Sequence, residues 1–173
     1  MNIVISDSTA LILFAKSNTL HFLSNLFEKI YIPQAVHDEL NFKDDIVKYR
    51  INEFDKISIK PVSDSLLLSK IAKLNIDKGE IEAITLALEL DLLLIIDEKK
   101  GRKIALNQGL KIVGILGILI ENYKQNFITY EKSHFYFKLL KNNGLRVSDE
   151  LEEIFYKKLV TIQHTNQIHK KHI

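Results

Sequence analysis

Short apolar runs alternate with segments of helical periodicity over the first two thirds of the chain. The runs IVIS, KIYI, ISIK, LLLII and KIVG predict five short strands, at residues 3–6, 29–32, 57–60, 92–96 and 111–114. Helical segments lie between and around them, at residues 8–16, 20–26, 33–40, 44–54, 64–73, from 77 onward and 99–108. Because strand and helix alternate throughout, the pattern favours an α/β fold with a parallel central sheet between two helical layers, a three-layer α/β/α arrangement with right-handed crossovers.

The helix expected from residue 77 carries acids on two opposite faces. At about 100° per residue, Glu82, Thr85 and Glu89 fall in one narrow polar stripe, which we expect to face solvent. Glu80 lies roughly opposite, at the N-terminal end of the apolar face. A carboxylate aimed at the core side of a helix is costly unless something compensates it, so Glu80 needs an explanation.

Three more acids follow predicted strands. The run LLLII is too apolar and too short for anything but a strand buried on both faces, and it ends at Asp97. Asp7 ends the first strand, and Glu39 projects within the inner arc of the helix after the second. Ligands of open α/β sheets bind beyond the carboxyl ends of the strands, where the strand order reverses. If strands one and four are neighbours there, these three carboxylates and Glu80 converge on one crevice.

Four carboxylates in one crevice favour a bound cation. They would repel one another, and burial alone would raise their pKa values. Mg²⁺ or Mn²⁺ suits a site of carboxylates and waters, whereas Zn²⁺ usually takes His or Cys ligands. Such an ion activates water and stabilises the charge that builds on a phosphate oxygen. The expected chemistry is metal-assisted hydrolysis of a phosphodiester.

Each acid taken alone has a simpler explanation. Asp7 and Asp97 both precede helices, so either is explained as an N-cap. Glu39 fits a solvated residue of a short helix. Glu80 near a helix N-terminus complements the helix dipole, although its place on the apolar face weakens that explanation. The hypothesis of a metal site therefore depends on the four acids occurring together.

Polar residues beside two of these acids extend the candidate site. Lys100 and Arg102, in a basic cluster behind Asp97, are the preferred contacts to nucleic-acid phosphates; the alternative is a solvated helix face. Ser8 and Thr9 follow Asp7 and are candidates to hydrogen-bond a metal-bound water, unless one of them caps the helix.

Composition excludes some classes and permits others. The chain of 173 residues is 46% hydrophobic and 27% charged, as expected of one soluble globular domain. It has no Cys, so disulfides and thiolate metal sites are excluded, and a cytoplasmic location is the simplest expectation. It begins with no secretory signal, and no apolar run is long enough to cross a membrane. A net charge of +2 permits a nucleic-acid partner without arguing for one.

The C-terminal part has helices but no strand. Helices at about 131–142 and 148–158 are joined by the segment NNGLRVSD, and we expect them to form a helical extension of one domain over residues 1–158. The run ILGILI at 115–120 fits a core helix. Residues 159–173, which include His164, His169 and His172, show no apolar period and are expected to be a flexible tail.

The sequence resembles the PIN-domain family of nucleases. The matching segments contain the four acids: ISDSTALILFAK around Asp7, IPQAVHDEL around Glu39, DKGEIEAITLAL around Glu80 and LLIIDEKKGRKIA around Asp97. A further match is LLKNNGLRVSDEL at 139–151. The similarity covers roughly residues 1–158 and is closest to a branch of PIN-like proteins with this GExEAI helix and DExxGRxxA segment.

The resemblance implies an α/β/α fold and a nuclease site that uses Mg²⁺ or Mn²⁺, held by the same four acids. It also implies kinship with VapC-type toxins, which are endoribonucleases silenced by an antitoxin, and a tendency to form homodimers. The sequence departs from the family pattern at three points. Glu80 stands where many toxins carry Asp, Glu98 beside Asp97 leaves the fourth ligand open, and the C-terminal helices go beyond the minimal domain.

The leading hypothesis is a metal-dependent endoribonuclease that acts on RNA, the toxin of a toxin–antitoxin pair. The alternative is a non-catalytic PIN-like module that binds RNA or a protein. A receiver-like signalling domain is a third possibility, but such a domain needs a Lys at the end of its last strand, where this chain has Gly114.

Overall fold

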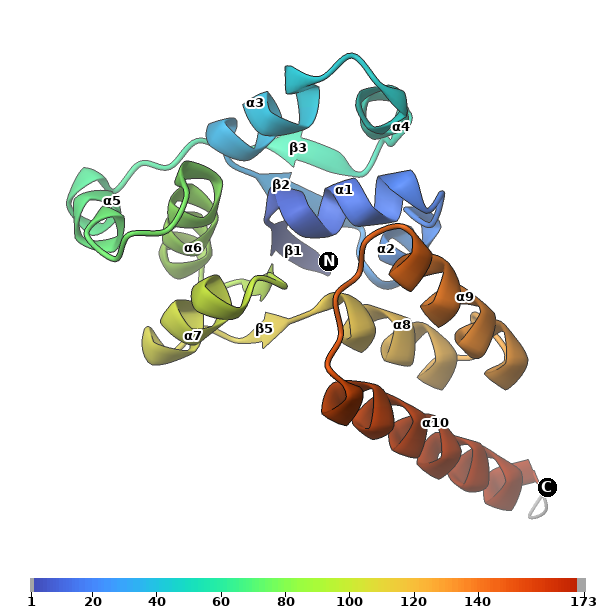
Figure 1. Ribbon diagram of the computed structural model, residues 1–173. Helices are drawn as coiled ribbons and strands as arrows, with labels where there is room; N and C mark the ends of the chain where they lie inside the picture. The colour runs from blue at the N-terminus through green and yellow to red at the C-terminus, as the bar shows by residue number, and fades with distance from the viewer. Residues whose placement is uncertain (1, 171–173) are drawn as a thin grey trace. The chain divides into compact units, whose positions relative to one another are not determined.

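A five-stranded parallel sheet forms the centre of the N-terminal part of the molecule. The computed structural model describes the backbone of residues 2–170 and the side chains of residues 2–165. The strands are β1 (Ile3–Ser6), β2 (Lys29–Ile32), β3 (Ile57–Ile59), β4 (Leu93–Ile95) and β5 (Ile112–Val113) (Figure 1). All four strand pairs are parallel. The predicted α/β/α class with a parallel sheet is thereby confirmed.

The strand order is β3-β2-β1-β4-β5, so the chain changes direction across the sheet between β1 and β4. These two strands are neighbours, with Val4 opposite Leu93 and Ser6 opposite Ile95. The backbone N–H of Asp7 continues the ladder by donating to the carbonyl of Ile95 at 3.1 Å. The predicted switch point between strands one and four is therefore present. Asp7 lies there, at the carboxyl end of β1.

Seven helices of the described chain accompany the sheet. They are α1 (Ser8–Lys16), α2 (His21–Leu26), α3 (Gln34–Phe42), α4 (Ile46–Glu53), α5 (Ser65–Ala72), α6 (Lys78–Leu90) and α7 (Lys99–Asn107). Four of them begin after an aspartate whose carboxylate accepts a backbone N–H of the first turn: Asp7, Asp45, Asp64 and Asp77. The N-cap explanation is thus correct for Asp7, although it uses only one of that residue's two oxygens.

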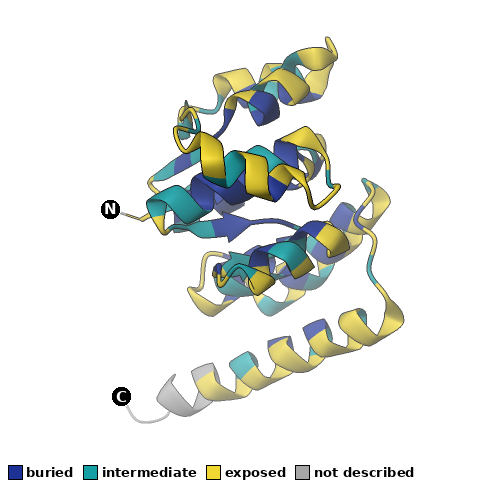
Figure 2. Ribbon diagram, turned by 90° about the vertical axis from the view of Figure 1, so that its left-hand side faces the viewer, coloured by how far each residue is buried: buried dark blue, intermediate teal, exposed yellow. Residues whose placement is uncertain are grey.

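The apolar core lies on the central strands and the inner faces of the helices. Val4 and Ile5 of β1 and Leu94 and Ile95 of β4 are fully buried, as expected for strands covered on both faces. Figure 2 shows the buried residues gathered along the strands and the inward sides of the helices. None of the described helices combines the length and apolar character needed to cross a membrane.

The polar stripe of α6 does not face solvent, and this prediction was wrong. Thr85 is fully buried and donates to the carbonyl of Ile81 at 2.7 Å. Glu82 accepts the backbone N–H of Ala35, in the first turn of α3, at 2.8 Å. Glu89 accepts the backbone N–H groups of Ser63 and Asp64, which precede α5. The stripe is covered because α3 and α5 pack against α6, and the glutamates satisfy N–H groups that a helix start leaves without partners.

The chain divides into two compact units, residues 1–115 and 116–173. The second unit contains α8 (Ile115–Lys124) except its first residue, together with α9 (Tyr130–Asn142) and α10 (Asp149–Lys170). Phe137 of α9 and Phe155 of α10 stack with their ring centroids 4.7 Å apart. The core-helix prediction for ILGILI is confirmed, since Ile115, Leu116, Ile118 and Leu119 are buried. A single domain over residues 1–158 stays a prediction.

The last helix is longer than predicted. We expected it to end near residue 158 and a flexible tail to follow, but α10 continues to Lys170. Leu159 is fully buried one turn beyond Phe155, so the apolar face continues past the expected end. Residues 171–173 and the side chain of His169 lie outside the described part of the chain.

Candidate active site

Asp7 is the most deeply buried acid of the candidate site, with 1% of its surface exposed. It joins β1 to α1, and its Oδ1 accepts the backbone N–H of Ala10 at 3.0 Å. Its Oδ2 is buried and has no hydrogen-bond partner among the described residues. Burial raises the pKa of Asp7 to about 7, and the nearby carboxylates of Asp97 and Glu80 contribute to the increase. One oxygen therefore serves the helix, and the other has no hydrogen-bond partner of good geometry, although the backbone N–H of Asp97 lies near enough to the carboxyl to oppose part of the rise in its pKa.

Glu80 also combines burial with an unsatisfied oxygen. It lies in the first turn of α6 and is 7% exposed, as its place on the apolar face predicted. Its backbone N–H donates to Oδ1 of Asp77 at 2.8 Å, while its side-chain Oε1 has no partner among the described residues. Burial raises the pKa of Glu80 to about 7, and the charges of Asp77 and Glu98 add to the effect.

Gly101 makes room for the Glu80 carboxylate. A Cβ atom at this position, in the first turn of α7, would overlap Glu80 Oε1 and lie 2.7 Å from Cδ1 of Ile96. Real Cβ atoms do not approach heavy atoms that closely, so any larger residue would displace the carboxylate or the helix. Because glycine is costly in a helix, its presence here is explained by the close approach of Glu80.

Asp97 follows β4, and its Oδ1 accepts the backbone N–H of Ile115 at 3.1 Å. Burial raises the pKa of this half-buried carboxyl, while the Ile115 N–H and the Arg102 guanidinium partly oppose the increase. Gly114 lies against it: a Cβ there would be 2.8 Å from both Asp97 Oδ1 and Arg102 Nη1. The glycine that ends KIVG therefore leaves space for this pair of charged groups.

The two basic residues predicted to contact phosphate are engaged within the protein. Arg102 is half-buried and donates to the carbonyl of Ile96 at 2.8 Å, which ties α7 to the end of β4. Lys100 donates to the carbonyl of Asn75. A role for either residue in binding phosphate stays a prediction.

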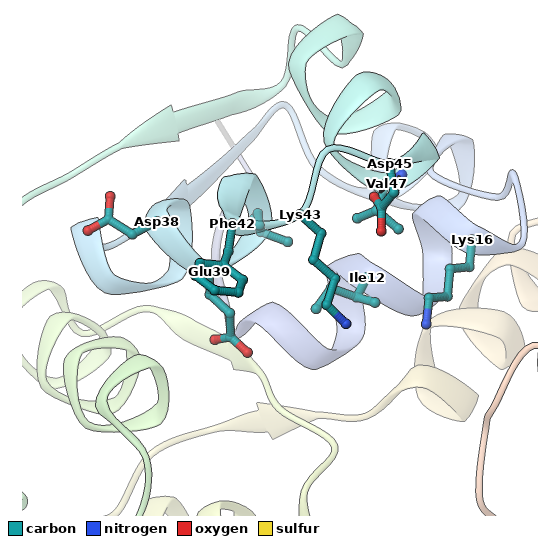
Figure 3. A pocket seen from close by; sticks show the side chains of 9 residues that line it. Ile12, Lys16, Asp38, Glu39, Phe42, Lys43, Asp45 and Val47 are labelled. Atoms are coloured by element: carbon teal, nitrogen blue, oxygen red, sulfur yellow. Dashed lines mark hydrogen bonds between the residues drawn. The ribbon is translucent and has the colours of Figure 1, made fainter.

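Glu39 differs from the other three acids in its exposure to solvent. We expected it on the inner arc of its helix, but Glu39 is exposed, while Ala35, Val36 and Leu40 take the buried positions. Its Oε2 lies 3.1 Å from where a Cβ of Gly79 would be, at the start of α6. Glu39 also lines a pocket of about 470 Å³ between α1, α3 and α4 (Figure 3).

The structure brings together three of the four predicted acids. Asp97 and Glu80 are close enough to Asp7 for their charges to raise its pKa. Ser8 beside Asp7 is buried, and Thr9 and Glu98 are exposed. Among residues 2–165, however, no group of three or more His, Asp or Glu side chains is arranged to hold a metal ion as it stands.

The donor set nevertheless fits a divalent cation. Two buried carboxylate oxygens without partners, Asp7 Oδ2 and Glu80 Oε1, are unfavourable unless a positive charge or a proton satisfies them. All the candidate ligands are oxygens, which Mg²⁺ and Mn²⁺ prefer.

The glycines and Asp77 were missed as parts of the site. Asp77 caps α6 and positions the backbone of Glu80. The available signal was the unusual place of Gly79 and Gly101 within the first turns of two helices, where glycine lowers stability unless close packing requires it.

The fold and the site define an α/β/α protein with buried acids at the switch point of a parallel sheet. A family model described as a PIN domain matches residues 3–160. The chain therefore belongs to the PIN-domain family, whose members are generally nucleases, and the resemblance noted in the sequence is confirmed.

Two solved structures show similarity to this chain. One is VapBC2 from Rickettsia felis bound to a DNA fragment from its promoter, with 15% identity and a TM-score of 0.50, covering 65% of this chain and 98% of that chain. The other is a PilT N-terminus domain protein from the archaeon Sulfolobus solfataricus P2, with 18% identity and a TM-score of 0.43, covering 86% and 98%. At 15% identity, the first similarity supports the fold alone. No curated protein matches the sequence.

Proposed function

We propose that this protein is a metal-dependent endoribonuclease, with Asp7, Glu80 and Asp97 as its central ligands and Glu39 completing the site. The observation that supports this most is the pair of buried, unsatisfied oxygens, Asp7 Oδ2 and Glu80 Oε1, at the switch point of a PIN-domain fold. A site for catalysis has a reason to keep such costly groups; a purely structural site does not.

The protein's residues have distinct parts in this proposal. Bound Mg²⁺ or Mn²⁺ would supply activation of water and stabilisation of the charge on phosphate. Asp7 is fixed by its cap bond to Ala10, and Asp97 by the N–H of Ile115, so each offers its remaining oxygen in a constrained direction. The Glu80 carboxylate packs against Gly101. Because this residue has no Cβ, it does not displace the carboxylate from the site.

We propose further that the enzyme is the toxin of a toxin–antitoxin pair and that it forms a homodimer. Membership of the PIN-domain family supports this, and the similar Rickettsia felis structure is itself a VapBC complex. An antitoxin protein is thus the expected partner, and RNA the expected substrate.

A non-catalytic binding module is the second candidate. It is favoured by the lack of an assembled group of three metal-binding side chains in the described part of the chain. Such a protein would bind RNA or a protein through the same fold without cutting.

Cleavage of a mixed RNA pool distinguishes the two candidates. Purified protein is incubated with Mn²⁺ or Mg²⁺, with EDTA, and as the variant Asp7→Asn. Cutting that requires both the metal and Asp7 is expected. The matched control is Asp55→Asn, which makes the same change at an exposed turn and should cut like the wild type. No cutting and no measurable metal binding would favour the binding module.

A further inference from the structure

Arg102 is a charged residue that the proposed function does not use. Its Nη1 donates to the carbonyl of Ile96 at 2.8 Å, so the guanidinium is held at the end of β4, next to the residue that precedes Asp97. The side chain is half-buried, and an arginine stays protonated at every pH at which proteins are folded. A permanent positive charge is therefore fixed at the end of the strand that leads to the acid site.

The guanidinium lies close to the Asp97 carboxylate without bonding to it. A Cβ atom on Gly114 would be 2.8 Å from both Arg102 Nη1 and Asp97 Oδ1, so these two atoms are at most twice that distance apart. Among the described residues, no ion pair within 4.0 Å joins Arg102 to an acid. Asp97 Oδ1 instead accepts the backbone N–H of Ile115 at 3.1 Å. The arginine thus acts on Asp97 through its charge and does not occupy a carboxylate oxygen.

The electrostatics of the acids agree with this geometry. Burial raises the pKa of Asp97, and the Ile115 N–H and the charge of Arg102 oppose the increase. For Asp7, burial raises the pKa and the charges of Asp97 and Glu80 raise it further. The negative charge that the acids gather at the switch point is therefore partly offset at Asp97 by the arginine.

We propose that Arg102 is a built-in counter-cation of the acid site: it offsets carboxylate charge in the metal-free protein and lowers the affinity of the site for a divalent ion. The inference rests on the proposed metal site and adds the residue that sets how readily this site fills. A positive charge held near a cation site repels the entering ion, and the repulsion doubles for a divalent ion relative to a monovalent one. The competing role for Arg102 is the phosphate contact expected from the sequence.

The Mn²⁺ affinity of the metal-free full chain, measured by calorimetry at low salt, tests the sign of the effect. Arg102→Met removes the charge and keeps an unbranched side chain, and it is expected to bind Mn²⁺ at least about threefold more tightly than the wild type. Arg102→Lys keeps the charge and should bind within about twofold of the wild type.

Arg50→Met is the matched control for loss of an anchored arginine. Arg50 is also half-buried and donates to a backbone carbonyl, that of Ala15, at 2.6 Å, but it belongs to α4. This variant removes the same charge and the same kind of hydrogen bond away from the acids. Its Mn²⁺ affinity should equal that of the wild type.

Salt distinguishes a charge effect from a change of shape. The difference in Mn²⁺ affinity between Arg102→Met and the wild type should shrink as salt rises from about 10 mM to about 500 mM, because dissolved ions screen the charge. A displaced Asp97 carboxylate would instead change the affinity at every salt concentration.

The metal-free protein gives an independent test of the charge offset. Arg102→Met also loses the bond to Ile96, so its effect is compared in two backgrounds, wild type and Asp97→Asn, by chemical denaturation in EDTA. The lost bond is common to both backgrounds. Arg102→Met should therefore lower the denaturation midpoint more in the wild-type background, where the Asp97 charge loses its counter-cation.

Weaker Mn²⁺ binding by Arg102→Met would overturn the proposal and show that the arginine holds Asp97 in place for the ion. Unchanged Mn²⁺ affinity would also overturn it, and weaker binding of a labelled RNA oligonucleotide in EDTA by the same variant would then assign Arg102 to phosphate. Equal losses of stability in the two backgrounds would contradict the charge offset. Failure of the proposed metal site gives a different pattern, because then neither the wild type nor any variant binds Mn²⁺.

Discussion

Glu80 and Glu82 lie two residues apart on α6 but differ in their hydrogen bonding. Glu82 is half-buried, and its Oε2 accepts the N–H of Ala35 at 2.8 Å, so its carboxylate holds α3 in place. Glu80 is more deeply buried and its Oε1 has no partner in the described structure. Both acids are buried on folding, but only one is satisfied by the protein. The comparison shows that burial alone does not identify a functional acid. The more informative feature is a buried carboxylate oxygen that has no hydrogen-bond donor within the protein.

The largest effects on metal binding and on the free energy of unfolding are expected when Glu80 or Glu82 is replaced by a neutral residue. Glu80→Gln should abolish Mn²⁺ binding and cleavage, yet leave the metal-free protein as stable as the wild type or more stable at pH 8, because a costly buried charge is removed. Glu82→Ala should have the reverse profile. It leaves the Ala35 N–H unsatisfied and should cost about 1–3 kcal/mol of unfolding free energy, with metal binding retained.

Chemical denaturation and calorimetry measure both quantities on the same samples. A Glu80→Gln variant that is less stable than Glu82→Ala, or that still binds Mn²⁺, would remove the distinction between the two acids.

The glycines sharpen the comparison at a smaller scale. Gly101→Ala should cost about 1–3 kcal/mol and weaken metal binding, because its Cβ would overlap Glu80 Oε1 and crowd Ile96. Gly79→Ala is the matched variant, also in the first turn of a helix. Its Cβ would lie 3.1 Å from Oε2 of the exposed Glu39 and 3.5 Å from the next nearest atoms. A small shift of Glu39 then suffices, and the better helix propensity of alanine should offset the cost. Thermal melts that rank the two variants in the opposite order would contradict the packing argument.

A smaller effect is expected from pH in the absence of metal. Folding raises the pKa of Asp7 from 3.8 to about 7 and that of Glu80 from 4.5 to about 7, so the folded state binds more protons than the unfolded state between these values. The free energy of unfolding should therefore fall as pH rises from about 4 to about 7 and change little from these groups above that range. Denaturation in EDTA across this range tests the sign, with Asp7→Asn expected to have a shallower slope. Stability that rises across the window and is indifferent to Asp7→Asn would be inconsistent with an unsatisfied acid site.

The strands and the buried acids were predictable because the signals are local. Strand ends at Asp7 and Asp97 follow from short apolar runs, and the inward direction of Glu80 follows from helical phase. The hypothesis that the acids converge required β1 and β4 to be neighbours in the sheet. The structure shows that they are.

The rest depended on contacts that sequence periodicity does not contain. Helical phase places Glu82 and Glu89 on one side of α6 but does not show that the starts of α3 and α5 lie against it. The same phase put Glu39 on an inner arc, whereas the side chain is exposed at the edge of a pocket. Beyond residue 158, Leu159 of α10 is fully buried, whereas the neighbouring Val160 is exposed and Ile162 is half-buried, so the apolar residues there give no clear helical period.

Titration of the purified, metal-free protein with Mn²⁺ by calorimetry tests most directly whether the unsatisfied acids form a metal site. The wild type and the control Asp55→Asn are expected to bind Mn²⁺ with the same affinity, and Asp7→Asn is expected to lose that binding while melting as a folded protein. Absence of binding by the wild type, or equal binding by Asp7→Asn, would contradict the assignment of Asp7, Glu80 and Asp97 as a metal centre.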